Sequence, residues 1–368
     1  MNLQWLPLFC WCFQGMKGNI IQQHLGTFSE IFHFIPGQIW KSECETKELR
    51  DISKKNANTL EAWSFLIQDS YQEIMSWYCS VHECCKQGDC RLINNITGLS
   101  HDLSIKLHGQ HLAKEVVMKA VKGFLANKSP EKALALSFHG CSGTGKNFVA
   151  KIIADNLYQD GLRSDCVHFY IAPFHFPHAR LVDVYKSQLQ RLILTAVQQC
   201  RQSLFIFDEA EKLHQGLIDA IMPYIDYHDH VNGVDFRESI FIFLSNVGGT
   251  SINRVVLDNW RAGRDREEIT MEDLEHLIQK EVTTSKGGFA HSVLVAENLI
   301  DFFIPFLPLE YKHVKLCVRD ALHSRGIKYS VDILDEVAKG MLYVPKEENL
   351  FSAQGCKSVS QRVNFFLP

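Results

Sequence analysis

The segment Gly140-Cys-Ser-Gly-Thr-Gly-Lys146-Asn147 decides the fold of this chain. An apolar run, Ala133 to Phe138, leads into it, and a helical pattern, Phe148 to Leu157, follows it. A strand, a glycine-rich loop and a helix in this order are the setting of a phosphate-binding loop. Glycines let the backbone curl so that several N–H groups point at one anion, and the helix N-terminus adds partial positive charge. The pattern therefore predicts a phosphate-binding loop, rather than a glycine-rich turn between two core elements.

Two side chains of the loop have predicted roles of their own. The ammonium group of Lys146 is expected to reach the β- and γ-phosphates of a nucleotide as a mobile point charge. Asn147 stands where Ser or Thr normally places a hydroxyl on Mg²⁺. An amide oxygen can ligate the ion or a bound water instead, and weaker or altered metal binding is the alternative. The predicted nucleotide contacts of the loop are Gly140, Cys141, Ser142, Gly143, Thr144, Gly145, Lys146 and Asn147.

Length and composition limit what the chain can be. Its 368 residues suit one large domain with a smaller partner, or two domains and an N-terminal segment. Hydrophobic residues make up 46% and charged residues 22%, which is ordinary for a globular protein. The net charge of −4 gives no indication of nucleic-acid binding. No apolar stretch reaches the roughly 18 residues that a conventional membrane span needs.

Twelve cysteines are many for a cytosolic enzyme, and seven of them fall in the first quarter of the chain. The cysteines of residues 79–90, with His82, leave a zinc site open, but two of them are adjacent, which is awkward for two ligands. Disulfides in an oxidising compartment are the favoured interpretation. Two sequons agree with it and predict glycosylation at Asn95 and Asn127.

The N-terminal quarter is the hardest part to interpret. Residues 1–13 are apolar without a basic n-region, so they form either a poor signal peptide or an unusual terminus. Residues 1–60 show no clear period and are set apart as a poorly defined segment. Residues 60–90 fit one amphipathic helix rich in Trp and Tyr, which either packs on a core or mediates peripheral membrane association. We take 61–94 as an amphipathic, cysteine-rich segment.

Hydrophobic periodicity predicts alternating helices and strands from residue 101 onward. The predicted strands are 167–171, 203–207 and 239–244, and the predicted helices are 101–126, 181–199 and 216–225. Continuous apolar strands that alternate with helices predict an α/β fold, with a parallel sheet covered on both faces. Ligands of such sheets bind at the carboxyl ends of the strands.

The C-terminal part reads differently. Beyond about residue 300 the strands are expected to stop. Helices are predicted over 309–324 and 331–341, followed by a shorter mixed tail, 357–366. This pattern divides the chain into a nucleotide-binding domain, 95–300, and a small helical domain, 301–368.

An apolar run from Leu204 ends in two acidic residues, Asp208 and Glu209. The strand would hold the Asp208 carboxylate where it can bind Mg²⁺ directly or through water. Glu209 is placed to orient and partly deprotonate a water for attack on the γ-phosphorus. Glu211 is expected on the surface. The alternative for the whole segment is a strand that ends in a solvated acidic turn.

Asn246 closes the next strand, and its amide is expected to hydrogen-bond the attacking water or the γ-phosphate. The alternative is an asparagine that satisfies a turn. We therefore predict a catalytic set of Glu209, Lys146 and Asn246, with Asn147 and Asp208 as the metal ligands.

A phosphate loop, an apolar strand ending in Asp-Glu, a polar residue after the next strand and a helical lid together define AAA+ ATPases. Gly-Thr-Gly-Lys-Asn at 143–147, the run Asn298–Tyr311 and Gly355-Cys356-Lys357 resemble the torsins, which are AAA+ proteins related to the Clp unfoldases. The resemblance covers roughly 95–366, and Asn147 is itself a torsin trait. It implies a parallel P-loop sheet flanked by helices and a helical lid, ATP and Mg²⁺ as cofactors, and a place in the lumen of the endoplasmic reticulum and nuclear envelope.

The resemblance also assigns roles in the lid. Lys357 matches the sensor 2 residue, which reports the γ-phosphate to the lid and would contact the nucleotide. Cys356 and Cys317 match a cysteine pair that torsins are thought to join as a redox-responsive disulfide. Such a bridge would tie the phosphate-sensing residue to a lid helix. Two buried free thiols are the alternative.

Torsins are described as weak alone, because they lack an arginine finger. AAA-like luminal domains of nuclear envelope and endoplasmic reticulum membrane proteins supply the arginine in trans, so the resemblance implies such partners and a homo- or hetero-oligomeric ring. Arg237 lies where Clp-type ATPases carry their own finger, and we favour a surface salt bridge for it. Residues 174–178 lie at the pore-loop position but lack the aromatic-Gly pattern of threading machines.

The leading interpretation is a torsin-like ATPase that remodels protein or membrane assemblies in the lumen. The first alternative is an ATP-gated binding switch or chaperone scaffold with negligible hydrolysis. The second is a scaffold anchored to a membrane surface through residues 60–90.

Overall fold

The computed structural model describes residues 91–285, 287–288 and 292–366. The predictions for the segment 1–60, for the helix over 60–90 and for the cysteines of 79–90 lie outside these residues. Within the described part of the chain, no helix combines the length and the apolar character needed to cross a membrane.

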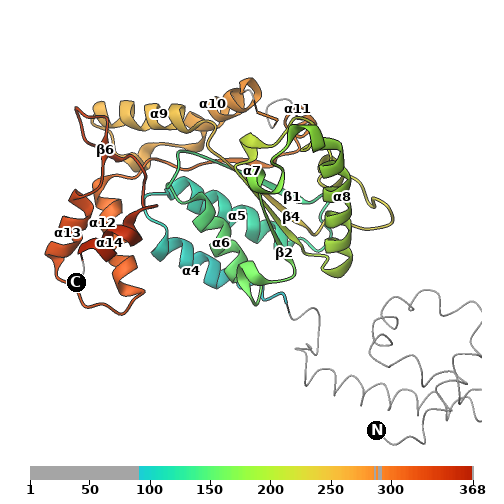
Figure 1. Cartoon of the computed structure of the whole chain (residues 1–368), viewed down its shortest axis with the longest axis horizontal. Helices are drawn as coiled ribbons and strands as arrows, with labels where there is room; N and C mark the ends of the chain where they lie inside the picture. The colour runs from blue at the N-terminus through green and yellow to red at the C-terminus, as the bar shows by residue number, and fades with distance from the viewer. Residues whose placement is uncertain (1–90, 286, 289–291, 367–368) are drawn as a thin grey trace, which may run out of the picture. The chain divides into compact units, whose positions relative to one another are not determined.

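A five-stranded sheet lies at the centre of the described chain (Figure 1). Its strands are β1 (Leu134–His139), β2 (Val167–Ile171), β3 (Leu204–Asp208), β4 (Ile240–Ser245) and β5 (Phe302–Pro305). The order is β2-β3-β4-β1-β5, and every neighbouring pair is parallel. Because β1 runs between β4 and β5, with His139 opposite Ser245, the loop that follows β1 leaves the carboxyl edge of the sheet between these two strands.

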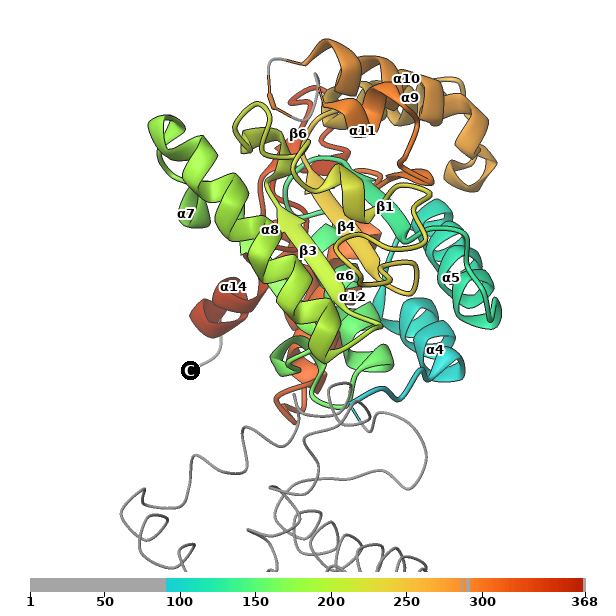
Figure 2. The same ribbon diagram turned by 90° about the vertical axis from the view of Figure 1, so that its right-hand side faces the viewer.

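Helices cover both faces of the sheet, as the continuous apolar strands predict (Figures 1 and 2). The flanking helices are α4 (Ile96–Lys106), α5 (His111–Ala126), α6 (Lys146–Leu157), α8 (Val182–Gln199), α9 (Gly249–Arg261), α10 (Met271–Thr284) and α11 (Val293–Ala296). The face under α4 and α6 is largely aliphatic. The face under α8 carries stacked rings, with Phe205 on Phe241 at 4.8 Å and Phe207 on Phe243 at 5.4 Å between centroids.

The prediction of a single helix over 101–126 is wrong, because a turn separates α4 from α5. Leu107 is extended, and Gly109 has a φ of +65°, which favours glycine. A Cβ at Gly109 would also come within 2.9 Å of the His313 ring. The periodicity detects the two apolar faces but not the turn between them, which lies next to the phosphate loop.

The helix predicted over 216–225 is also wrong. These residues form a series of turns that ends in the 3₁₀ helix η8 (Met222–Tyr224). The backbone bonds run from residue i to i−3, as from Ile221 to Ile218. Gly216 has a φ of +80°, and Pro223 has no N–H to give to an α-helix. The apolar side chains are buried all the same, which accounts for their helical spacing.

Strands do not stop at residue 300, because β5 extends the sheet beside β1, with Leu136 opposite Phe302. The run is only four residues long, too short for periodicity to distinguish from a loop. The lid that follows contains α12 (Tyr311–His323), α13 (Val331–Lys339), the antiparallel strands β6 (Tyr343–Val344) and β7 (Phe351–Ser352), and α14 (Val359–Phe366). Its three helices share an apolar core of their own.

Candidate active site

The phosphate loop joins β1 to α6 through three glycines with positive φ. The φ is +150° at Gly140, +81° at Gly143 and +114° at Gly145. The Thr144 hydroxyl donates to the Cys141 carbonyl at 2.8 Å and closes the curl. This backbone, followed directly by a helix N-terminus, is suited to present successive N–H groups to an anion.

Lys146 is only 6% exposed and lies against its own loop. Its Nζ donates to the Gly140 carbonyl at 2.6 Å, to the Cys141 carbonyl at 3.0 Å and to Asn246 Oδ1 at 3.0 Å. Burial lowers the pKa of Lys146 to about 8, although the nearby Glu211 carboxylate acts in the opposite direction. All three ammonium donors are thus engaged, so a phosphate would take the place of loop carbonyls.

The two predicted metal ligands touch each other. Asn147 Nδ2 donates to Asp208 Oδ2 at 2.6 Å, and Asp208 Oδ1 accepts from the Glu209 backbone N–H at 2.9 Å. Carboxylate and amide oxygens suit Mg²⁺, so these residues fit the ion. An ion held by both would need the oxygen of Asn147, rather than its NH₂ group, to face Asp208.

The acidic turn after β3 differs from the prediction. Glu209 has a φ of +54°, and its carboxylate pairs with exposed Lys212 at 2.9 Å. The 3₁₀ helix η7 (Ala210–Lys212) follows and returns the chain toward the sheet edge. Glu211, expected on the surface, therefore lies inside the site, where Oε1 accepts from Asn246 Nδ2 at 2.8 Å.

Asn246 thus lies between two charged side chains at the end of β4. Its oxygen accepts from Lys146 and its NH₂ group donates to Glu211. Its backbone carbonyl accepts from Gly249 N at 3.2 Å in the turn before α9, a bond that does not involve the side chain.

The lid meets the phosphate loop through backbone atoms. Cys356 N donates to the Gly143 carbonyl at 3.1 Å. A Cβ at Gly143 would overlap the Gln354 carbonyl, and a Cβ at Gly355 would overlap the Gly143 carbonyl. Exposed Lys357 follows directly, and its charge adds to burial, the main cause, in lowering the pKa of Lys146.

Two disulfides are present in the described residues. Cys317 in α12 bonds Cys356 with 6.2 Å between Cα atoms, so the residue before Lys357 is tied to a lid helix. Cys166, before β2, bonds Cys200, after α8, with 5.6 Å between Cα atoms. Free Cys141 accepts a bond from Asn253 Nδ2 at 3.3 Å.

A cavity of about 290 Å³ opens between the α4–α5 turn and α12. It is lined by His108, Gly109, Gln110, His111, Lys114, Glu267, His313 and Leu316. Gln110 is 1% exposed and donates to the carbonyls of Thr144 and Leu307 at 2.9 and 2.8 Å. The cavity is therefore fixed to the phosphate loop through Gln110.

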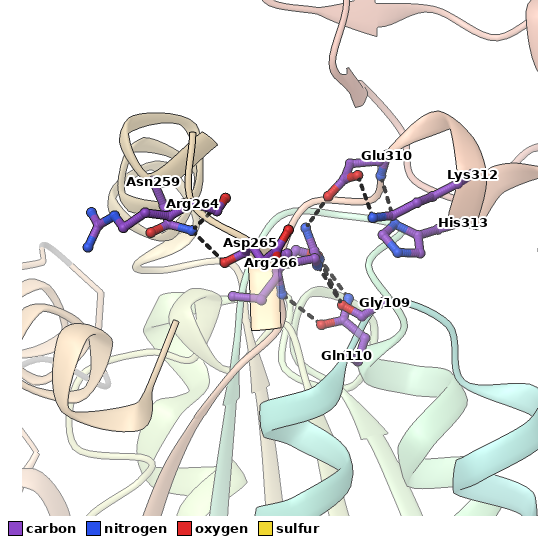
Figure 3. A network of polar contacts seen from close by, with 10 residues as sticks. Gly109, Gln110, Asn259, Arg264, Asp265, Arg266, Glu310, Lys312 and His313 are labelled. Atoms are coloured by element: carbon purple, nitrogen blue, oxygen red, sulfur yellow. Dashed lines mark hydrogen bonds and ion pairs between the residues drawn. The ribbon is translucent and has the colours of Figure 1, made fainter. Parts of the chain in front are cut away.

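Buried Arg266 belongs to a polar network beside the α4–α5 turn (Figure 3). Its Nη2 donates to the Gly109 carbonyl at 2.7 Å, and its Nη1 lies 3.2 Å from Glu310 Oε1. Asn259 donates to the Asp265 carbonyl at 2.9 Å and holds the preceding turn. Arg266 thereby joins the cavity wall to the residue that caps lid helix α12.

Other predicted residues lie away from this centre. Arg237 is bound by Asp235 and Asp229, at 2.9 and 2.8 Å, in the favoured surface salt bridge. Asn95 caps α4, accepting from Gly98 N at 2.8 Å, and exposed Asn127 accepts from Ser129 N at 3.1 Å. Glycosylation of either asparagine stays a prediction.

Comparison with known proteins identifies the family. The Torsin family model matches residues 79–207, and the model named Torsin-1A, C-terminal domain, matches 309–366. Human Torsin-3A is 53% identical over 334 residues, which cover 90% of this chain and 83% of the human protein. The chain belongs to the torsin family. A torsin-like protein of Caenorhabditis elegans is 42% identical over 289 residues, covering 78% of this torsin and 81% of its own length.

Solved structures show the fold of this torsin. Hsp104 in a closed state with ATPγS and FITC-casein gives a TM-score of 0.53, and the S. cerevisiae Hsp104–ADP complex gives 0.55. Each is 20% identical and matches 74% of this chain. The torsin spans less than half of each Hsp104 chain, 46%. At this identity the likeness establishes the AAA+ fold.

Three site residues escaped the sequence-based prediction. Gly109 in a helical pattern was a signal for the turn that places Gln110 in the site. Glu211 gave no signal, because its position depends on the left-handed Glu209. The charge of Arg266 indicates a surface residue, and only the folded chain places it in the interior. The pairing of Cys166 with Cys200 cannot be deduced from sequence.

Proposed function

We propose that this torsin binds MgATP and hydrolyses it to remodel protein or membrane assemblies in the lumen of the endoplasmic reticulum and nuclear envelope. One observation carries the proposal. The loop 140–147 is joined to the carboxyl ends of β4 and β3, by Lys146 to Asn246 at 3.0 Å and by Asn147 to Asp208 at 2.6 Å. Donors for phosphate and oxygens for a cation thus meet at the carboxyl edge of a parallel sheet.

The chemistry follows from these side chains. Lys146 would exchange the carbonyls of Gly140 and Cys141 for phosphate oxygens. Mg²⁺, when bound, would neutralise phosphate charge, with Asn147 and Asp208 as its protein ligands. The carboxylate of Glu209 would accept the proton of the attacking water after leaving Lys212.

The nucleotide base of ATP would occupy the cavity at the α4–α5 turn. Its volume of about 290 Å³ suits a small ligand group, and Gln110 fixes it to the phosphate loop. Lys357 would approach the γ-phosphate from the lid. The position of the lid would then depend on which nucleotide is bound.

The proposal includes a partner. Arg237 is held by Asp235 and Asp229, so we assign the missing arginine to an AAA-like luminal domain that supplies it in trans. Such an arginine is worth about 10³–10⁵ in rate in related NTPases. The two disulfides support an oxidising compartment such as the lumen.

An ATP-gated switch with negligible hydrolysis is the second candidate. Two contacts favour it. Glu209 is paired with Lys212, and Asn147 faces Asp208 with its NH₂ group rather than with its oxygen. Both contacts must break before the residues can act in hydrolysis.

Nucleotide binding and turnover by the purified full chain test the proposal. Lys146→Ala is expected to weaken MgATP binding about 100-fold, the loss of one or two charge-assisted hydrogen bonds. Glu209→Gln is expected to bind normally and to lose turnover. Exposed Lys128→Ala is the matched control. Unchanged affinity in Lys146→Ala would refute the site, whereas binding without turnover, even with a luminal AAA-like domain added, would favour the switch.

A further inference from the structure

Glu211 has an unusual position for an acidic residue beside a phosphate site. Its Oε1 accepts from Asn246 Nδ2 at 2.8 Å. Its Oε2 is buried, and within the described residues it has no hydrogen-bond partner. Leaving a buried carboxylate oxygen without a donor costs free energy.

The two neighbours of Asn246 fix the orientation of its amide. Lys146 can only donate, so the amide oxygen must face it, and the Glu211 carboxylate can only accept, so the NH₂ group must face that side. A flipped amide would set NH₂ against an ammonium and oxygen against a carboxylate. One N–H of Asn246 is used by Glu211, and the amide carries a second.

The backbone holds Glu211 in this place. The turn is closed by Lys212 N donating to the Glu209 carbonyl at 2.8 Å. Gly287 packs so tightly on this turn that a Cβ there would overlap the Glu211 carbonyl. The carboxylate is therefore presented by a fixed loop, unlike an exposed side chain that meets Asn246 by chance.

We propose that Glu211 is a positioning residue, which orients the Asn246 amide so that its second N–H is presented to the γ-phosphate or the attacking water. The proposal rests on the ATPase function proposed above. It distinguishes the two glutamates of the turn, since Glu209 would act on the water and Glu211 would act through Asn246.

Single-turnover hydrolysis of γ-³²P-labelled ATP, with the full chain in excess, tests this role. Glu211→Gln is expected to slow hydrolysis about 10-fold, within the range for residues that orient a ligating group, while the affinity for ATP changes less than about 3-fold. The neutral amide keeps the shape but can both donate and accept, so Lys146 alone is left to dictate the orientation of Asn246. Exposed Glu131→Gln makes the same chemical change away from the site and should leave the rate unaltered.

A double-mutant cycle separates positioning from a general structural role. If Glu211 acts through Asn246, the variant carrying both Glu211→Gln and Asn246→Ala is as slow as Asn246→Ala alone. Multiplied effects of the two changes, or a wild-type rate in Glu211→Gln, would overturn the proposal while leaving the ATPase function intact. A wild-type chain that neither binds nor hydrolyses ATP would overturn both. Thermal unfolding of each variant verifies that the fold is retained.

Discussion

At the scale of single residues, the site depends on glycines where backbones meet. Gly143 and Gly355 both have positive φ, and a Cβ at Gly143 would overlap the Gln354 carbonyl while a Cβ at Gly355 would overlap the Gly143 carbonyl. The lid can therefore donate from Cys356 N to the phosphate loop without a side chain between them. A change at either glycine acts on both domains.

Gly355→Ala is expected to displace the lid from the loop and to weaken ATP binding about 10-fold or more, because its Cβ overlaps the Gly143 carbonyl. Gly326→Ala is the matched control, since Gly326 also has a positive φ, +67°, but open space around it. Titration with a fluorescent ATP analogue measures both. Equal losses in the two variants would mean that backbone strain, and not the contact, is responsible.

His313 gives the chain a pH dependence. Burial, with the charge of Arg266 next, lowers the pKa of His313 to about 3. Because the folded chain holds it neutral, its contribution to stability is full above pH 6.5 and is lost as pH falls toward 3. The free energy of unfolding should drop by about 1.4 kcal/mol for each pH unit below 6.5 on account of this group.

Urea unfolding between pH 7.5 and 5 tests this, with His313→Gln for comparison. The variant should lose less stability on acidification than the wild type over this range. Parallel curves for the two proteins would show that His313 is not the group that titrates.

At the scale of elements, sequence reasoning found the strands whose apolar runs are continuous, β1 to β4, and the helices α6, α8, α12 and α13. It failed at Gly109 and Pro223, where a backbone feature overrides periodicity, and at β5, whose four residues are too few to show a period. It also gave no prediction for the helices α9 and α10. The sequence predicted those residues of the candidate site that come directly after a strand. Glu211 and Arg266 were not, because turns and tertiary contacts place them.

The bond between Cys166 and Cys200 ties β2 to the end of α8 across a separation of 34 residues. Closing a loop of this length stabilises a fold by about 4 kcal/mol in the chain-entropy view. Replacing both cysteines by alanine should therefore lower the denaturant midpoint markedly, with Cys141→Ala as the control at a free thiol. A midpoint that stays at the wild-type value would count against a structural role for the bond.

At the scale of the whole molecule, polar contacts in the described part of the chain join the lid to the nucleotide-binding domain. Three of them lie near the site: Cys356 N to the Gly143 carbonyl, Arg266 between Gly109 and Glu310, and His108 Nε2 at 2.5 Å from Asp320 Oδ2. Another pairs Arg261 of α9 with Glu348. The first three link the phosphate loop and the proposed base cavity to the lid. We therefore expect nucleotide binding at the site to depend on the position of the lid.

Arg266→Met should break this coupling. It leaves Glu310 and the Gly109 carbonyl without their buried partner, a loss of about 3–5 kcal/mol in stability. Arg266→Lys keeps the charge but cannot reach both groups, so its stability should lie between that of the wild type and that of Arg266→Met. Exposed Arg264→Lys is the control. Calorimetric unfolding with and without ATP measures the effect, and an Arg266→Lys variant as stable as the wild type would contradict a bridging role.

The structure of the full-length Glu209→Gln chain with ATP and Mg²⁺ tests the central claim most directly. We predict the triphosphate within the loop 140–147, with Lys146 Nζ on its β- and γ-phosphates and the cation beside Asp208 and Asn147. A nucleotide bound elsewhere, or a loop that keeps Lys146 on the carbonyls of Gly140 and Cys141 at saturating ATP, would contradict it.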